Sequence, residues 1–421
     1  MVNHCIIKIF RVTNKLVVCI KLWSNRNIWI ILSGEFIAGL GLWLGIIGNL
    51  EFLQAKVDSD FLKSLILSTG IIFGLAFGPL AGKVADQYEK KKILNIASFG
   101  RMVSVLFMFM ALYFDSIIFL IFFAISIQIC AAFYFPALQS TIPLVVKGPD
   151  LITMNGAHMN INTVARILGT TIAGTLLLIM PLWMLYAGSF VAYFFLFLFT
   201  MTLNIKEEPK VEKVGKSKGS FKEVLPVIKS YPVVTITLIL AVIPTLFLGG
   251  FNIMVISVST FYENTSVIKS IIYAVEGMTF MIGAFFIKRV RLRFNEFSIM
   301  FFSAFMIGLA QLLLYFVEHI AIIYISFGVL GFFVGCLVPV AVTIFQTKMP
   351  KEFHGRFFSF RNMVDRVMFQ VVLLSTGMLL DLVGLKIMVL IFGTIGVCTT
   401  STLFFYYRKY QKSSKVQKIS A

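Results

Sequence analysis

The chain has 421 residues, of which 59% are hydrophobic and 13% charged, and its mean hydropathy is +0.93. This composition is too apolar for an ordinary soluble globular protein and indicates an integral membrane protein. The net charge of +18 would suggest a nucleic-acid partner only if it lay on one soluble face, and no long basic soluble segment is present. The five cysteines lack the spacing of metal ligands or of a disulfide framework.

Residues 1–26 form a basic N-terminal segment without a small-residue cleavage site after a clean apolar core, so a cleaved signal peptide is not expected. We interpret it as an amphipathic helix on the inner leaflet. A regulatory or lipid-sensing element and an over-extended reading frame are the alternatives. The basic residues of this segment are Lys8, Arg11, Lys15, Lys21 and Arg26.

Twelve apolar runs follow, and each is long enough to cross a bilayer as a helix. The runs are 28–50, 62–85, 93–113, 117–142, 157–180, 182–204, 233–258, 268–288, 297–316, 320–343, 362–384 and 386–407. A Lys- and Glu-rich linker at 205–232 separates the first six from the last six. We therefore predict an all-α integral membrane fold of twelve transmembrane helices in two pseudo-symmetric six-helix bundles, 27–204 and 233–407, with a basic tail at 408–421.

The positive charges predict the orientation of these helices. With the N-terminus inside, the inner segments hold 30 Lys and Arg and the outer loops hold 4. Because positively charged loops stay on the cytoplasmic side, we expect both termini to be cytoplasmic in a plasma-membrane protein. The charge of +18 then faces the inner membrane surface, and no nucleic-acid partner is needed.

The turn between the second and third runs is short and charged. It resembles the signature loop between helices 2 and 3 of the major facilitator superfamily, although Gln87 and Glu89 depart from the usual pattern. The resemblance implies a gating role, in which this loop holds the two bundles together. The loop residues concerned are Gly78, Gly82, Asp86, Lys90 and Lys91.

Two further segments are similar to the bacterial efflux branch of that superfamily, which contains macrolide and siderophore exporters. They begin at Phe135-Pro136-Ala137 and at Gln346-Thr347, and Gln139 to Pro143 recurs as Gln346 to Pro350. The resemblance implies a central cavity and rocking of two bundles. The antiporter motif of that superfamily is only partly present in the fifth run, 157–180, with Gly169 and Gly174 as its packing glycines. The fourth run, 117–142, lacks the arginine that many drug:proton antiporters have at this place.

Ionisable residues inside the membrane runs are costly and are therefore candidates for functional roles. We expect Glu35 and Glu276 to be protonatable groups, with Arg166 tuning one of them; a structural ion pair is the alternative. Secondary candidates, for which a structural or gating role is favoured, are Arg101, Gln128, Asp365 and Arg366. His158 is expected to be solvated near the cytoplasmic end of its helix.

No nucleotide-binding loop, zinc motif or nucleophile elbow is visible, so we predict neither an enzyme with catalytic residues nor a cofactor or metal. The predicted function is a secondary exporter of hydrophobic or amphiphilic small molecules, working by proton antiport and alternating access. Its partners would be the lipid bilayer, the substrate and protons, and it is expected to act as a monomer. The alternatives are an exporter of a specific metabolite such as a siderophore, and a transport-inactive membrane sensor or scaffold.

Overall fold

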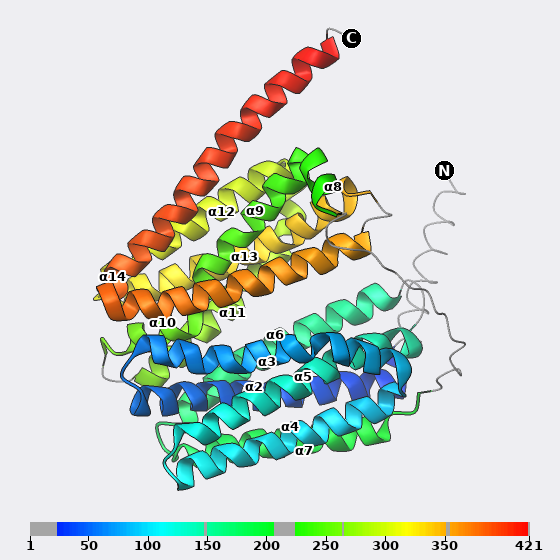
Figure 1. Ribbon diagram of the computed structural model, residues 1–421, viewed down its shortest axis with the longest axis vertical. Helices are drawn as coiled ribbons and strands as arrows, with labels where there is room; N and C mark the ends of the chain where they lie inside the picture. Colours follow the sequence, from blue (N-terminus) through cyan, green and yellow to red (C-terminus); the bar gives the residue numbers. More distant parts are fainter. Residues whose placement is uncertain (1–22, 147–149, 206–223, 263–264, 351–353, 420–421) are drawn as a thin grey trace, which may run out of the picture. The chain divides into compact units, whose positions relative to one another are not determined.

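A computed structural model describes residues 23–146, 150–205, 224–262, 265–350 and 354–419, and all regular elements in these ranges are helices (Figure 1). Contacts divide the chain into two compact units. Unit 1 is Met1–Asn49 with Thr69–Lys213, and unit 2 is Leu50–Ser68 with Val214–Ala421. Two helices therefore contribute residues to both units.

Unit 1 is built from the predicted first six runs. The α4 helix packs against α5 and α7, and Figure 1 shows α4 and α7 side by side. The turn between α3 and α4 is only two residues long, Tyr88 and Glu89, as expected for a tight hairpin. The helices are α2 (Arg26–Lys56), α3 (Asp60–Gln87), α4 (Lys90–Tyr113), α5 (Ile117–Val145), α6 (Asp150–Leu176) and α7 (Trp183–Thr202).

Unit 2 holds the last six predicted runs, with α11 against α13 and α12 against both α13 and α14. The seventh run is divided at Gly249–Gly250 into α9 and α10. Lys386 donates a hydrogen bond to Glu318 and lowers the pKa of that loop carboxyl. The helices are α8 (Val224–Ser230), α9 (Pro232–Leu248), α10 (Phe251–Ser259), α11 (Thr265–Val290), α12 (Glu296–Leu313), the 3-10 turn η2 (Leu314–Phe316), α13 (Ile320–Lys348) and α14 (His354–Ile419).

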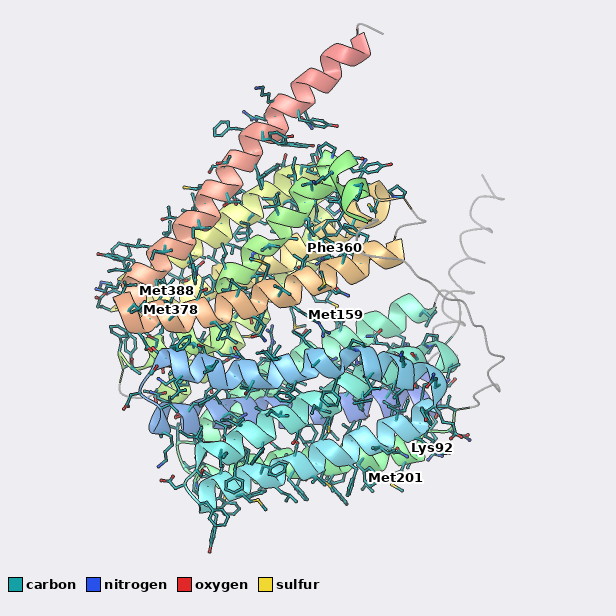
Figure 2. The ribbon with its side chains drawn as sticks, in the orientation of Figure 1. Lys92, Met159, Met201, Phe360, Met378 and Met388 are labelled. Carbon is teal, nitrogen blue, oxygen red and sulfur yellow. The ribbon has the colours of Figure 1, made fainter. Side chains whose placement is uncertain are left out.

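The α14 element spans both the eleventh and the twelfth predicted runs. Gly384 interrupts it with φ 76° and ψ 171°, a backbone conformation that is essentially restricted to glycine. Met378 and Met388, one on each side of this break, are labelled in Figure 2. The break thus separates two helices, one beginning at His354 and one ending at Ile419, where the sequence predicts runs at 362–384 and 386–407.

Ten described stretches are long and apolar enough to cross a membrane, and one of these, Phe360–Gln411, covers both predicted runs in α14. The predicted all-helical membrane fold is confirmed. Several boundaries differ from the predicted ones: α8 forms inside the predicted linker, α6 begins at Asp150 instead of 157, and α14 begins at His354 instead of 362 and continues to Ile419 instead of ending at 407. Residues 1–22 and 206–223, which make up most of the predicted N-terminal segment and linker, lie outside the described residues.

The α6 helix does not belong to these ten stretches, because polar residues interrupt its apolar run. Four of its residues recur at helical spacing: His158, Asn162, Arg166 and Gly169. Residues at this spacing share one helix face, so α6 carries a polar stripe along its length. Glu35 of α2 meets this stripe at His158.

Candidate functional site

Glu35 is the centre of a buried polar cluster in unit 1. It lies nine residues after the start of α2, about 13 Å along the helix at 1.5 Å per residue, and only 5% of its surface is exposed. Its Oε1 accepts a hydrogen bond of 2.6 Å from the Tyr134 hydroxyl on α5. Its Oε2 lies 3.0 Å from Nε2 of His158 on α6. Three helices therefore meet at one carboxyl.

The His158 ring has two competing partners for one nitrogen. Nε2 is 3.0 Å from the Glu35 carboxylate and 3.3 Å from the Asn162 side-chain nitrogen. That nitrogen donates to Glu35 when it carries a hydrogen and accepts from Asn162 when it does not. In the second case the contact with Glu35 persists only if the carboxyl carries the proton. The cluster can thus hold a proton on either group.

Arg101 of α4 borders the cluster. Its guanidinium carbon lies 4.2 Å from the ring centroid of Tyr134 and 5.2 Å from that of Phe135. These distances are within the range of cation–π attraction, about 6 Å. Nε of Arg101 is buried and has no hydrogen-bond partner among the described residues. The guanidinium thus lies over aromatic rings within the membrane run.

Close helix packing brings the polar stripe of α6 to α2. A Cβ added to Gly169 would lie 2.8 Å from Cβ of Trp43, and one added to Gly39 would lie 2.7 Å from Cβ of Ala165. Real Cβ atoms do not approach this closely, so the two glycines permit the approach. Small residues at such contacts are typical of membrane helix pairs. Both glycines lie further along α2 and α6 than Glu35 and His158. They let the two helices pack closely, and this packing brings His158 within reach of Glu35.

The other candidates inside the membrane runs lie on α5, α6 and α11. The guanidinium carbon of Arg166 lies 5.9 Å from the ring centroid of Trp43 on α2. Arg166 precedes Gly169 on α6 by about one helical turn. Glu276 is on α11 in unit 2, where its side chain is buried. Gln128 on α5 packs beside Gly70 of α3.

The signature-loop residues lie at the end of α3 and the start of α4. Gly78, Gly82 and Asp86 are still helical, and Asp86's side chain lies outside the described part. No described atom lies within 4 Å of a Cβ built at Gly78 or Gly82. Lys90 is buried and Lys91 half-buried, while Lys92, labelled in Figure 2, forms a 3.1 Å ion pair with Glu89.

The remaining candidates are at the start of α14. Asp365 lies 3.3 Å from Nε of Arg361, four residues earlier, and Arg366 is exposed. Gly174 is a buried helical residue of α6. Within the described ranges, no group of three His, Cys, Asp or Glu side chains is placed to hold a metal ion.

Sequence reasoning missed two members of the cluster. The expectation that His158 is solvated is wrong, because its side chain is only 14% exposed and contacts Glu35. Tyr134 was not singled out, since a tyrosine in an apolar run is usually a packing residue. The one available signal was the four-residue spacing of His158, Asn162 and Arg166, which shows a shared face but not what it meets.

A bundle of membrane-length helices with buried ionisable groups inside it is typical of proteins that move solutes across a bilayer. The family described as Major Facilitator Superfamily matches residues 31–369. The chain therefore belongs to the major facilitator superfamily, and it is a transporter of that type.

The relatives are distant but extend over most of the chain. Macrolide efflux protein A of Streptococcus pyogenes is 22% identical over 366 residues, covering 82% of this chain and 87% of that protein. The staphyloferrin A transporter of Staphylococcus aureus is 22% identical over 391 residues, covering 90% and 95%. The crystal structure of the nucleoside transporter NupG is similar with a TM-score of 0.73 at 14% identity, covering 91% and 99%, which supports the fold alone.

Proposed function

We propose that this protein is a secondary exporter of hydrophobic or amphiphilic small molecules, driven by proton antiport through alternating access, with both termini in the cytoplasm. The observation that carries the proposal is the contact between Glu35 and His158, two protonatable groups of unit 1 whose side chains are only 6% and 14% exposed. The basic inner segments support the orientation.

The cluster has the chemistry that proton coupling needs. A transported proton must be bound in one state of the carrier and released in another. Glu35 can exchange its proton with a neighbour already in contact, His158, and Asn162 can satisfy the ring nitrogen once the proton has left it. Nε2 of His158 therefore has a partner in either protonation state. Glu276 remains a second candidate for proton linkage in unit 2, and Arg166 a candidate for tuning Glu35 or Glu276.

The substrate class rests on the relatives and on the composition. A macrolide efflux protein and a siderophore transporter match at the same identity, 22%. The chain is 15% aromatic, which suits contacts with amphiphilic molecules. Export of one specific metabolite, such as a siderophore, is the second candidate and is favoured by the staphyloferrin A relative. An accumulation screen of drugs and metabolites in a strain lacking other pumps separates the two.

The coupling test uses Glu35→Gln in reconstituted vesicles. Gln keeps the size and hydrogen-bonding capacity of the side chain but cannot carry the proton. We expect Glu35→Gln to abolish efflux driven by a pH gradient and to spare gradient-free exchange of substrate. Glu276→Gln provides the comparison for unit 2. If both variants keep full pH-driven efflux, the proton is carried elsewhere and this assignment is wrong.

A further inference from the structure

Tyr134 lies between a cation and a carboxylate. Its hydroxyl donates to Oε1 of Glu35 at 2.6 Å, and its ring lies 4.2 Å from the guanidinium carbon of Arg101. All three residues are almost fully buried, with exposed fractions of 5% for Glu35, 2% for Tyr134 and 7% for Arg101. A single side chain thus connects the two charged groups without a direct ion pair.

Arg101 is deep in its helix. It lies eleven residues after Lys90, the first residue of α4, which corresponds to about 16 Å of helical rise. A guanidinium at that depth needs compensation, because a charge is costly near the middle of a bilayer. The described residues provide the rings of Tyr134 and Phe135 and, beyond the Tyr134 hydroxyl, the charge of Glu35.

The proton on Glu35 and the stacking of Arg101 should depend on each other. A phenol that donates to a carboxylate becomes more electron-rich, which strengthens the attraction of its ring for a cation. A nearby positive charge in turn favours the ionised carboxyl. Protonating Glu35 weakens both effects and leaves Arg101 with less compensation.

Other groups also face Glu35, and each can affect its proton. His158 of α6 contacts the second carboxylate oxygen. Tyr193 of α7 interacts electrostatically with Glu35, Arg101 and Cys130. Because these groups are common to wild type and to variants at Arg101 or Tyr134, they do not obscure a comparison between them.

We propose that Arg101 and Tyr134 are positioning residues that set the proton occupancy of Glu35, so that any movement of α5 relative to α2 that breaks the Tyr134 hydrogen bond also changes the proton affinity of the site. This inference rests on the proposed function and deepens it. It links the carboxyl on α2 to the packing of α4 on α5 and assigns the tuning of Glu35 to Arg101.

The test follows the carboxyl itself in purified full-length protein. Infrared difference spectroscopy during a pH titration detects a protonated carboxyl, and the band that Glu35→Gln removes belongs to Glu35. In Arg101→Met we expect this band to appear at a pH about one unit higher than in wild type, the size expected from a desolvated cation–π contact. Tyr134→Phe keeps the ring but removes the hydrogen bond to the ionised carboxyl, and we expect a shift in the same direction. Arg101→Lys keeps the charge and should fall between wild type and Arg101→Met.

Arg408→Met is the matched control, because the Arg408 guanidinium also stacks on a ring, that of Phe404 at 4.5 Å, but belongs to unit 2, whereas Glu35 belongs to unit 1. It should leave the Glu35 band at its wild-type pH. The proposal is overturned if Arg101→Met and Tyr134→Phe titrate as wild type does, if Arg408→Met shifts the band equally, or if no titrating band depends on Glu35. The infrared measurement does not depend on transport. If the bands shift as expected but the protein shows no pH-driven efflux, the proposed function is contradicted and this inference is not.

Discussion

A single ring nitrogen in the Glu35 cluster has two competing partners. Nε2 of His158 lies 3.0 Å from a carboxylate oxygen and 3.3 Å from the Asn162 amide nitrogen, and it can serve only one of them as acceptor or donor. The histidine therefore has two satisfied states instead of one. A residue with two alternative partners suits a site that changes its protonation during a cycle.

The contact between Glu35 and His158 predicts energetic coupling that can be measured without any substrate. We expect Glu35→Gln and His158→Asn each to lower the thermal stability of the purified protein, and the double variant to lose less than the two together. Residues in direct contact typically show an interaction energy of about 0.5–3 kcal/mol. Combining Glu35→Gln with Arg408→Met, a residue of unit 2, should give additive losses. Additive losses in the Glu35–His158 cycle as well would show that this contact contributes nothing.

For single residues, the sequence predicts which side chains are functional candidates better than it predicts which side chains they contact. Glu35 was identified from its charge inside an apolar run, and it does lie buried in a polar cluster. Its partners come from α5 and α6, more than 95 residues away, and their approach depends on how the helices pack. Periodicity within one helix carries no information on that packing. Tyr134 and His158 could not be assigned to Glu35 for this reason.

The elements themselves were largely predictable, because the length and apolarity of each run determine whether a helix can cross a bilayer. The exceptions are instructive. The α6 run was predicted although His158, Asn162 and Arg166 lower its hydropathy. The extension of α14 to Ile419 was not predicted, because a basic tail has no apolar periodicity to reveal a helix.

The break in α14 depends on one glycine, which gives an element-scale prediction. Gly384 has φ 76°, and no described atom lies within 4 Å of a Cβ built there, so alanine would add backbone strain without a clash. We expect Gly384→Ala to lower the free energy of unfolding by about 1–3 kcal/mol, measured by thermal denaturation in detergent.

Gly156 of α6 is the matched control for this variant. It has equally open surroundings among the described atoms, but it lies within a helix and has no positive φ. Gly156→Ala should be neutral or stabilising, by up to about 1 kcal/mol, because alanine favours the helix. Equal losses in the two variants would show that backbone conformation at Gly384 is not the cause.

For the whole molecule, the division into two units does not follow the midpoint of the chain. Residues 50–68 comprise the end of α2, the connection after it and the start of α3, and they belong to unit 2. The rest of both helices belongs to unit 1. Three contacts tie this segment to unit 2. The Glu51 carboxylate lies 2.8 Å from Nζ of Lys269, the Asp381 carboxylate accepts the backbone N–H of Asp60 at 2.7 Å, and Gly377 packs against Ser64.

The ion pair is the most consequential of these contacts, because Lys269 is fully buried and Glu51 is 19% exposed. Removing one partner of a buried pair leaves an uncompensated charge and costs about 3–5 kcal/mol. We therefore expect Glu51→Gln to loosen residues 50–68 from unit 2. The exchanged pair, Glu51→Lys with Lys269→Glu, keeps one charge of each sign and should hold the segment in place.

Ser64 reports on this loosening, because its side chain is buried while Asp58 in the same segment is exposed. In a variant without native cysteines, Ser64→Cys should react slowly with a membrane-impermeant maleimide added outside the cell. Adding Glu51→Gln should accelerate the reaction by about tenfold or more, since 1.4 kcal/mol already corresponds to a factor of ten, and the exchanged pair should slow it again. Asp58→Cys should react rapidly in every background, which checks that the segment faces outward. If Glu51→Gln leaves the Ser64→Cys rate unchanged, the buried ion pair does not hold this segment, and the Asp381 contacts with the start of α3 become the stronger explanation for its place in unit 2.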